Sequence, residues 1–274
     1  MARASKTKPA AKKQTKNITF GRLRRYNFMA AALLAVQGVL VLVLSSPQKG
    51  VRPIGAFFVT KDNLASNAAG HQVTATASQH LFDVNLACVV AAFFFISALV
   101  RLLIATWRRK TYESDLGRGI NRARWIEYAF AAGTMLAAIA ILGGVLDIAS
   151  LAMIFVLVVV TSLLGMAMEL RNQNEKRVDW ASYNIGLLTG VTPWAITLLY
   201  IWISHVYGSG VPGFVYWIYF SLLVLFVGFA LNMNFQYKKL GFWGNYLYGE
   251  RVYILLSFIT ITVLGWQIFF GTLK

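Results

Sequence analysis

The chain of 274 residues is 58% hydrophobic and 13% charged, which excludes an ordinary soluble domain and indicates a membrane protein. One cysteine and three histidines supply neither a disulfide framework nor a multi-ligand metal site. The net charge of +16 does not indicate nucleic-acid binding, because the basic residues flank apolar runs and do not alternate with aromatic residues on one polar surface.

The first 25 residues carry nine of the 26 Lys and Arg residues and no acidic residue. We expect segment 1–25 to be a disordered cytoplasmic tail that faces lipid. A secretory signal is not indicated, because the first apolar run, 28–44, is followed by six more.

Seven apolar stretches reach the roughly 20 residues that a helix needs to cross about 30 Å of hydrocarbon. They are 26–45, 82–106, 120–146, 150–170, 181–205, 212–236 and 251–272. Residues 26–272 are therefore expected to form one all-α membrane domain, a bundle of seven transmembrane helices.

The connection 47–81 between the first two stretches is the longest on its side of the membrane. Its segments 56–62 and 71–78 have strand-like composition, and 63–70 is typical of a turn. We expect a small β-hairpin lying on the outer face and held by a partner surface, since two strands alone are marginally stable.

The distribution of basic residues predicts the orientation. With the N-terminus inside, 21 of the 26 Lys and Arg residues lie in inner segments, and four lie outside. The sequence thus predicts a cytoplasmic N-terminus and an extracellular C-terminus in the plasma membrane. His71, His80 and His205 fall on the outer side, where we expect solvated histidines and no metal site, and Cys88 is expected to be a packing residue.

Several motifs carry a family resemblance. They are FALNMNFQYKKLGFWGNYLYGERVYILLS, GWQIFFGTL, INRARWIEY, LLAVQG and FFISALVRLL. Together they resemble the heliorhodopsin family over nearly all of the chain after the tail. The resemblance implies a seven-helix retinal protein, usually a homodimer with an inside N-terminus, strands in its first outer loop and a slow photocycle without established ion pumping.

The family's last helix carries a lysine four residues after a serine and five before a tryptophan. Counting from Ser257 and back from Trp266 gives Ile261. Retinal attaches by condensation of its aldehyde with a primary amine, so an isoleucine side chain cannot form the linkage. Every other lysine lies outside mid-membrane depth, and the Arg101 guanidinium stays protonated and is a poor nucleophile. The resemblance therefore implies a member without covalent retinal, and we expect retinal itself to be absent.

The resemblance also implies where the charges lie. Glu127 matches the carboxylate that balances the protonated Schiff base, and Arg101, four residues after Ser97, stands where the family has histidine. Leu34, three residues before Gln37, replaces a second histidine. Our hypothesis is that Arg101 neutralises Glu127 and holds both carboxylate oxygens through paired hydrogen bonds. The alternative is that Arg101 snorkels to the lipid headgroups and Glu127 is protonated.

Other positions correspond by family position to the residues around the polyene. They are Met135, Pro193, Trp194, Phe226 and Ser257, with Pro193 and Trp194 interrupting the fifth helix and Ser257 near the attachment point. Ordinary bundle packing is the alternative for each. Without a chromophore, larger side chains, water or lipid must fill the cavity, because native interiors leave few voids.

Three functions stay open. The first is a retinal-free, non-enzymatic signalling or scaffolding protein that uses the basic inner loop 107–124 and the tail, although these charges could equally serve orientation and lipid binding. The second is a photoreceptor that holds retinal or another polyene non-covalently. A channel or transporter is third, because only Glu127 and Arg101 are ionisable candidates within the spans. No enzyme motif is present, and a soluble partner has no signature.

Overall fold

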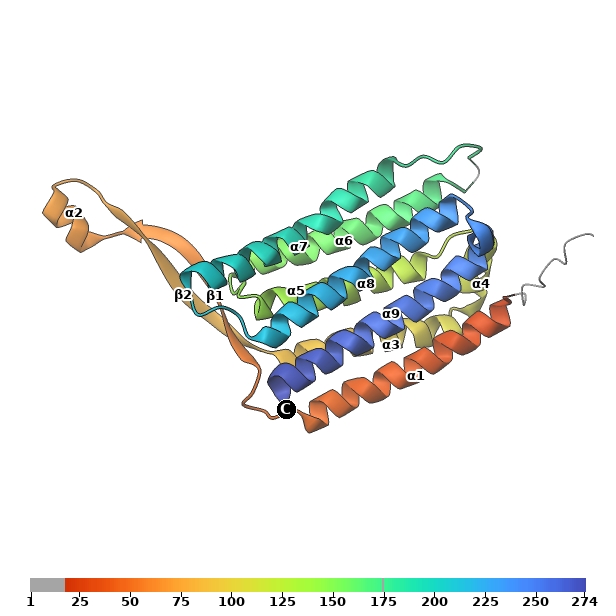
Figure 1. Cartoon of the computed structure of the whole chain (residues 1–274), viewed down its shortest axis with the longest axis horizontal. Helices are drawn as coiled ribbons and strands as arrows, with labels where there is room; N and C mark the ends of the chain where they lie inside the picture. Colours follow the sequence, from red (N-terminus) through yellow and green to blue (C-terminus); the bar gives the residue numbers. More distant parts are fainter. Residues whose placement is uncertain (1–17, 174) are drawn as a thin grey trace, which may run out of the picture.

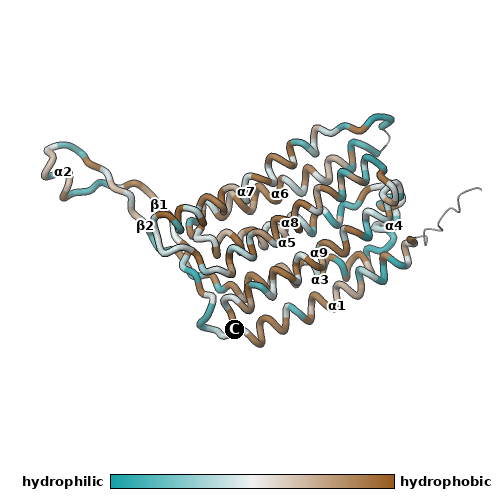
Figure 2. The backbone as a smooth tube through the Cα atoms, viewed as in Figure 1, coloured by the Kyte–Doolittle hydropathy of each residue, from teal (hydrophilic) through white to brown (hydrophobic). Residues whose placement is uncertain are grey.

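The computed structural model describes residues 18–173 and 175–274 of the chain. Within them, seven helices are long and apolar enough to cross a membrane. They are α1 (Phe20–Leu44), α3 (Leu86–Ala105), α5 (Arg122–Leu142), α6 (Ile148–Arg171), α7 (Ala181–Tyr207), α8 (Gly213–Tyr237) and α9 (Tyr246–Ile268). The helices run side by side as one elongated bundle (Figure 1), and a π-helical turn, η2 (Phe269–Leu273), continues α9. Figure 2 shows apolar residues along the middle of the helices and polar ones at both ends. The predicted seven-helix fold is confirmed.

We call the end of the bundle where α1 begins the inner end, since the charge distribution predicts that it faces the cytoplasm. Two short elements lie there, α4 (Arg109–Gly117) and the 3₁₀ turn η1 (Gly241–Gly244). The sequence predicted only a loop at α4. The helix buries Tyr112, Asp115 and Leu116 against the bundle and exposes its other side.

Two helix boundaries differ from the expected ones because polar caps, and not hydropathy, set them. Helix α1 begins at Phe20 inside the expected tail, after Thr19, whose hydroxyl accepts a hydrogen bond from the Arg22 amide at 3.3 Å. The rest of that tail, 1–17, lies outside the described residues. Helix α3 begins at Leu86, later than expected, after Asn85, whose side chain accepts from the Ala87 amide at 2.8 Å.

The predicted hairpin is present but longer than expected. Strands β1 (Val51–Lys61) and β2 (Thr74–Asn85) pair antiparallel from Val51 opposite Asn85 to Lys61 opposite Thr74, with one irregularity at Ile54 and Gly55. In place of the expected turn, a helix, α2 (Asn63–Ala69), is capped by Asp62 and ends at Gly70, whose φ of +70° suits glycine.

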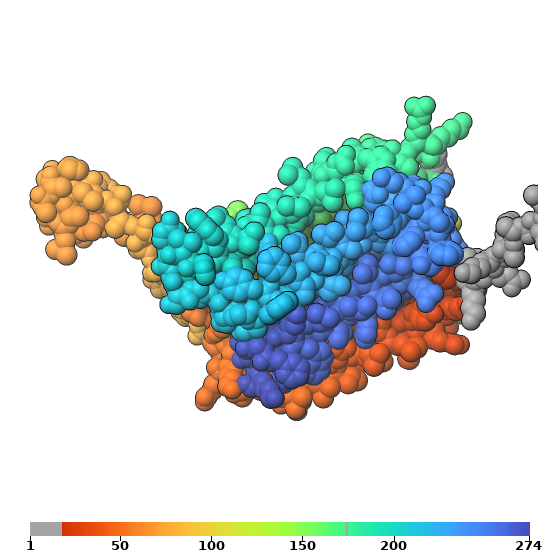
Figure 3. All heavy atoms as spheres, viewed as in Figure 1, coloured from red at the N-terminus to blue at the C-terminus, as the bar shows by residue number. Residues whose placement is uncertain are grey.

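The hairpin projects beyond the outer end of the bundle as a separate lobe, so the expectation that it lies on the outer face is wrong (Figures 1 and 3). Only its base is tied to the helices. The Gly55 amide donates to the Leu146 carbonyl at 3.0 Å, and Ile54 is buried against the core.

Two expectations about packing need correction. Cys88 is exposed on the perimeter of the bundle and is not a core residue, because its neighbours Leu86, Ala87 and Val90 occupy the inward face of α3. Helix α7 runs without interruption through Pro193, and the Thr197 hydroxyl donates to the Pro193 carbonyl at 2.9 Å.

Candidate functional site

Arg101 and Glu127 face each other in the interior of the bundle. Arg101, on α3, places Nε 3.2 Å and Nη2 3.1 Å from Oε1 of Glu127 on α5. The exposed fractions of the two residues are 2% and 3%. The charged head of Arg101 thus lies in the interior and does not reach the lipid headgroups. Both contacts reach the same oxygen, so the guanidinium does not hold both carboxylate oxygens as expected. The cation beside Glu127 comes from α3, whereas the resemblance implies a positive charge on the last helix.

The remaining donors of Arg101 are also satisfied within the bundle. Nη2 donates to the Ser257 hydroxyl on α9, and Nη1 donates to the Asn27 side-chain carbonyl on α1 at 3.4 Å. Because an isolated ion in an apolar interior costs several kcal/mol, these contacts explain how a guanidinium is tolerated here. The single arginine therefore joins four helices at one point.

A cavity of about 220 Å³ lies beside this ion pair. Ser97 of α3 and Ser257, Thr260 and Ile261 of α9 line it on one side, and the rest of its lining, from α5 to α8, is mainly apolar. Ile261 is buried, with 3% of its surface exposed, at the position expected for the family lysine. The lining, within the part of the chain that the structure describes, contains no amine side chain.

The sequence-predicted residues divide into those that line this cavity and those that do not. The lining includes Ser97, Met135, Trp194, Phe226, Ser257 and Ile261. Leu34 and Pro193 are buried but are not part of the lining. Leu34 belongs to the core cluster that α1 shares with its neighbours, so ordinary packing describes it.

The cavity opens towards the lipid between α7 and α8. Its lining includes Leu187 and Val191 of α7 and Val227 of α8, and their exposed fractions are 41%, 62% and 48%. Gly186 and Gly190 also line the cavity from α7, and they face Leu164 and Thr161 of α6. A narrow apolar molecule could enter from the bilayer without crossing either polar face.

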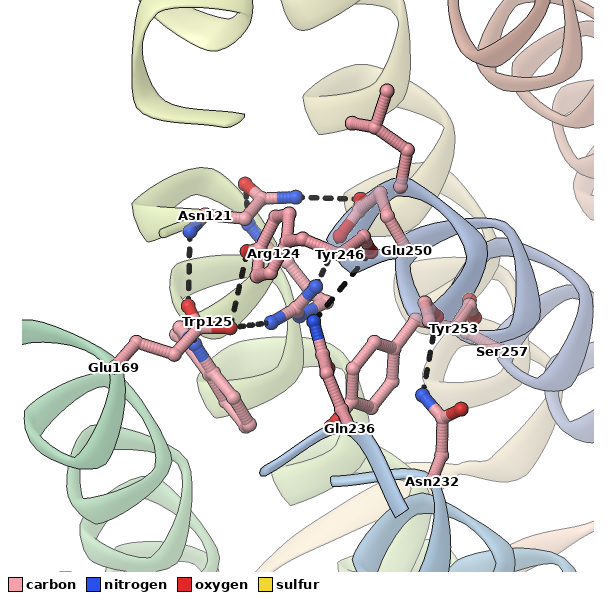
Figure 4. A network of polar contacts seen from close by, with 12 residues as sticks. Asn121, Arg124, Trp125, Glu169, Asn232, Gln236, Tyr246, Glu250, Tyr253 and Ser257 are labelled. Carbon is pink, nitrogen blue, oxygen red and sulfur yellow. Dashed lines mark hydrogen bonds and ion pairs between the residues drawn. The ribbon is translucent and has the colours of Figure 1, made fainter. Parts of the chain in front are cut away.

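A second set of buried charges lies at the inner end. Arg124 on α5 forms ion pairs with Glu169 on α6 and Glu250 on α9, and the exposed fractions of the three residues are 3%, 2% and 2%. Figure 4 shows the guanidinium of Arg124 between the two carboxylates. Its central carbon lies 3.9 Å from the centre of the Tyr253 ring, a cation–π contact.

The carboxylate of Glu169 has several further donors. It accepts from the Asn121 amide at 2.9 Å, from Trp125 Nε1 at 2.7 Å and from the Tyr246 hydroxyl at 3.1 Å. Glu250 accepts from the Asn121 side chain at 2.7 Å. These contacts tie α5, α6 and α9 together at the inner end and close it with polar side chains.

The expectation that only Glu127 and Arg101 lie within the spans is therefore wrong. Arg124, Glu169 and Glu250 lie within a turn or two of helix ends, where the sequence pattern looks like ordinary flanking charge. Spacing could have found two of them, because Arg124 is three residues before Glu127, and Glu250 is seven before Ser257, which places each on the same helix face.

The fold and the site agree with the comparisons with known proteins. A model of the heliorhodopsin family matches residues 23–273. The chain belongs to the heliorhodopsin family. A similar solved structure is the crystal structure of a light-driven proton pump, LR (Mac), from Leptosphaeria maculans, with a TM-score of 0.54 and 13% identity over 91% of this chain and 93% of that one. At this identity the likeness shows a rhodopsin-like fold alone. Curated protein sequences gave no match.

The histidines of this heliorhodopsin lie apart from the site. His80 is 3.0 Å from Asp83 on the hairpin, and the His71 Nδ1 atom lies 3.0 Å from the Ala69 carbonyl. His205 is exposed near the end of α7. Among the described residues, His, Cys, Asp and Glu side chains form no group of three that could hold a metal ion.

Proposed function

We propose that this heliorhodopsin works without an imine-bound retinal, as a non-enzymatic signalling or scaffolding protein of the plasma membrane. The observation that carries the proposal is the buried Ile261 side chain in the cavity lining, where the chemistry of the family requires an amine. The Arg101 guanidinium supports it, because it already neutralises Glu127 and leaves no unpaired carboxylate for a protonated Schiff base.

Borohydride trapping tests this proposal. The purified protein is incubated with all-trans retinal and reduced with sodium borohydride, which converts an imine into a stable secondary amine. We expect no retinyl mass on the wild-type chain. The matched positive control is I261K, which returns an amine to the cavity and is expected to be labelled. A retinyl group on a wild-type cavity peptide would contradict the proposal.

The cavity and its lateral opening favour a second candidate function, non-covalent binding of retinal or another linear apolar molecule. The lining is mainly apolar and carries several separate hydroxyl groups, including those of Ser97, Thr161 and Ser257, which suits an apolar chain with a neutral polar end. Membrane lipid or water would occupy the same volume if no such ligand is bound.

Absorbance spectroscopy separates the two candidates. Non-covalent binding predicts a stable, shifted retinal band in the wild type. The band should be lost in A132F, which fills the cavity from α5, and kept in V156F, which adds the same ring on the exposed side of α6. A free-retinal spectrum in the wild type would leave the retinal-free protein as the better description.

The inner end is the surface through which we propose that the protein acts, with the N-terminus in the cytoplasm. Exposed basic residues gather on and around α4, including Arg108, Arg109 and Lys110. They suit anionic lipid headgroups or an acidic segment of a cytoplasmic partner. Labelling of cysteines introduced at Lys110 and at Lys61 in sealed cells, each in a C88S background because Cys88 is exposed, tests the orientation. It predicts that only the Lys61→Cys variant reacts from outside.

A further inference from the structure

A chain of hydrogen bonds joins the cavity site to the charged cluster at the inner end. Arg101 Nη1 donates to Asn27 Oδ1 at 3.4 Å, and Asn27 Nδ2 donates to the Tyr112 hydroxyl at 3.1 Å. The Tyr112 hydroxyl donates to Glu250 Oε1 at 3.3 Å. Glu127 is therefore connected to Glu250 through three intervening side chains.

Every donor in this chain points the same way, from Arg101 towards Glu250. Hydrogen bonds aligned in this manner polarise one another, and they are stronger where water is excluded. The exposed fractions are 2% for Asn27 and 4% for Tyr112, so both intermediates are buried. A change of charge at Glu127 alters the field on Arg101 and hence the strength of each later bond.

The charges at the two ends make the chain sensitive to such a change. Arg101 and Arg124 face three carboxylates, Glu127, Glu169 and Glu250, so the buried set carries one excess negative charge when all are ionised. The tyrosine remains a donor throughout, because burial, and then the Glu250 carboxylate, raise the pKa of Tyr112 well above its ordinary value.

Tyr112 connects the chain to the surface of the protein. It belongs to α4, which has nine residues and is too short to be stable in isolation. The helix is held on the bundle by Tyr112, Asp115 and Leu116, and its opposite side carries basic residues. The packing of α4 thus depends in part on a hydroxyl that bonds to the interior.

We propose that the hydrogen-bond chain Arg101, Asn27, Tyr112 couples the charge state of Glu127 to the docking of α4 on the inner end of the bundle. Protonation of Glu127, or a ligand that neutralises the carboxylate, removes a competing anionic acceptor from Arg101. The bonds from Arg101 through Asn27 to Tyr112 and Glu250 then strengthen and hold α4 more firmly on the bundle, whereas ionisation of Glu127 loosens α4 and its basic surface. This inference rests on the proposed function, in which the inner surface is where the protein acts.

Hydrogen exchange of the full-length protein in nanodiscs tests the coupling through the amides of residues 109–117. In E127Q we expect exchange to fall by up to about fivefold, the factor that corresponds to one net hydrogen bond. N27L should raise exchange, and E127Q should have no effect in the N27L background, because the chain that carries the coupling is then broken. The matched control is N232L, which removes a buried asparagine of α8 that bonds to Gly249 and Trp243, and it should leave α4 unchanged.

Unchanged or faster α4 exchange in E127Q, or the same fall in exchange when E127Q is made in the N27L background, would overturn the inference. If E127Q does not fold, E127D takes its place, because it keeps the charge but retracts the carboxylate from Arg101, and the same two outcomes decide. Failure of the coupling leaves the borohydride result untouched, so it is distinguishable from failure of the proposed function.

Discussion

Arg101 is stable in the interior only because Glu127 and two neutral acceptors surround it. We predict that R101L lowers the free energy of unfolding by about 3–5 kcal/mol, since it leaves the Glu127 carboxylate buried without a cation. R101L/E127Q should recover most of that loss, because neither member of the buried pair is then charged. Thermal or denaturant unfolding in detergent micelles measures both changes.

The control for this prediction is R109L, which removes the partner of Glu113 on the exposed side of α4. The Arg109 and Glu113 side chains meet at 2.7 Å but are 47% and 25% exposed. Water screens this pair, so the expected loss is below about 1 kcal/mol. Equal losses of unfolding free energy in R101L and R109L would contradict the prediction that the buried ion pair stabilises the fold more than the exposed one.

Residue spacing predicted much of the cavity site and little of the inner cluster. Counting from Ser97, Ser257 and Trp266 predicted that Arg101 and Ile261 lie at the site, because helical periodicity fixes which residues share a face. Asn27 of α1, which bonds to Arg101, and Tyr112 of α4, which bonds to Asn27, were not predictable, since these contacts depend on how separate elements approach one another.

At the scale of single helices, two glycines of the cavity wall have opposite roles. A Cβ atom on Gly165 of α6 would lie 2.3 Å from the Trp125 ring, which is fixed by its 2.7 Å hydrogen bond to Glu169. We predict that G165A lowers the free energy of unfolding by about 1–3 kcal/mol through overpacking.

The matched control for G165A is G186A on α7. Its added Cβ atom would find its nearest neighbour at 3.6 Å, an ordinary contact. Replacing a helical glycine by alanine is then neutral or stabilising by up to about 1 kcal/mol. Unfolding in micelles should give opposite signs for the two variants, and a similar loss in both would contradict the argument from close packing.

The start of α6 gives a prediction that depends on pH. Asp147 caps the helix, with its carboxylate accepting from the Ser150 amide at 2.8 Å and the Ser150 hydroxyl at 2.9 Å. The hydrogen bond from the Ser150 backbone lowers the pKa of Asp147 in the folded protein. Its stabilising contribution is therefore complete above the unfolded pKa of about 4 and is lost as the pH falls through the folded pKa.

D147A should lower the free energy of unfolding by about 1 kcal/mol at pH 7, and this difference from the wild type should narrow below about pH 4. D147N keeps a capping oxygen but has no charge, so it should lose only the pH-dependent part of the stabilisation at pH 7 and approach the wild type at low pH. Melting temperatures of each variant and the wild type between pH 3 and pH 7 measure these differences, with D62N in the distant hairpin as control. A D147A gap that is constant down to pH 3 would contradict the role of the carboxylate charge.

Hydropathy predicted the seven membrane helices well, because a run of about 20 apolar residues has few possible structures other than a membrane-spanning helix. It failed for α2 and α4, which are short and polar and whose signals are caps or single buried residues, such as Asp62 and Gly70 around α2. It also placed the start of the second span too early, since Leu81 and Phe82 are apolar but belong to strand β2.

For the molecule as a whole, the buried polar residues gather in one half of an otherwise apolar bundle. Glu127 and Arg101 lie beside the cavity, and Arg124, Glu169 and Glu250 follow towards the inner end, while the outer half packs mainly through apolar side chains. Such a division makes the inner half the part whose structure depends on charge. The outer half holds the bundle together and carries the hairpin.

The projecting hairpin has apolar side chains that no other part of the described chain covers. Its strand β1 exposes Phe57, Phe58 and Val59 to 60%, 48% and 69%. The hairpin itself projects beyond the bundle (Figure 3). Two strands with an uncovered apolar edge are marginally stable in water, so a second copy in a homodimer is the surface that we expect to cover them.

We predict that F57T/F58T/V59T, which keeps strand propensity but removes apolar area, weakens dimerisation at least tenfold. Light scattering of the protein in detergent measures the mass of the particle, and the melting temperature checks that the bundle is intact. The control is S78T/Q79T, which alters the opposite strand at the positions paired with Phe57 and Ala56 without removing apolar surface. A triple variant that remains a dimer at the same dilution would show that the hairpin is not covered by a second copy and that its apolar side chains meet another partner.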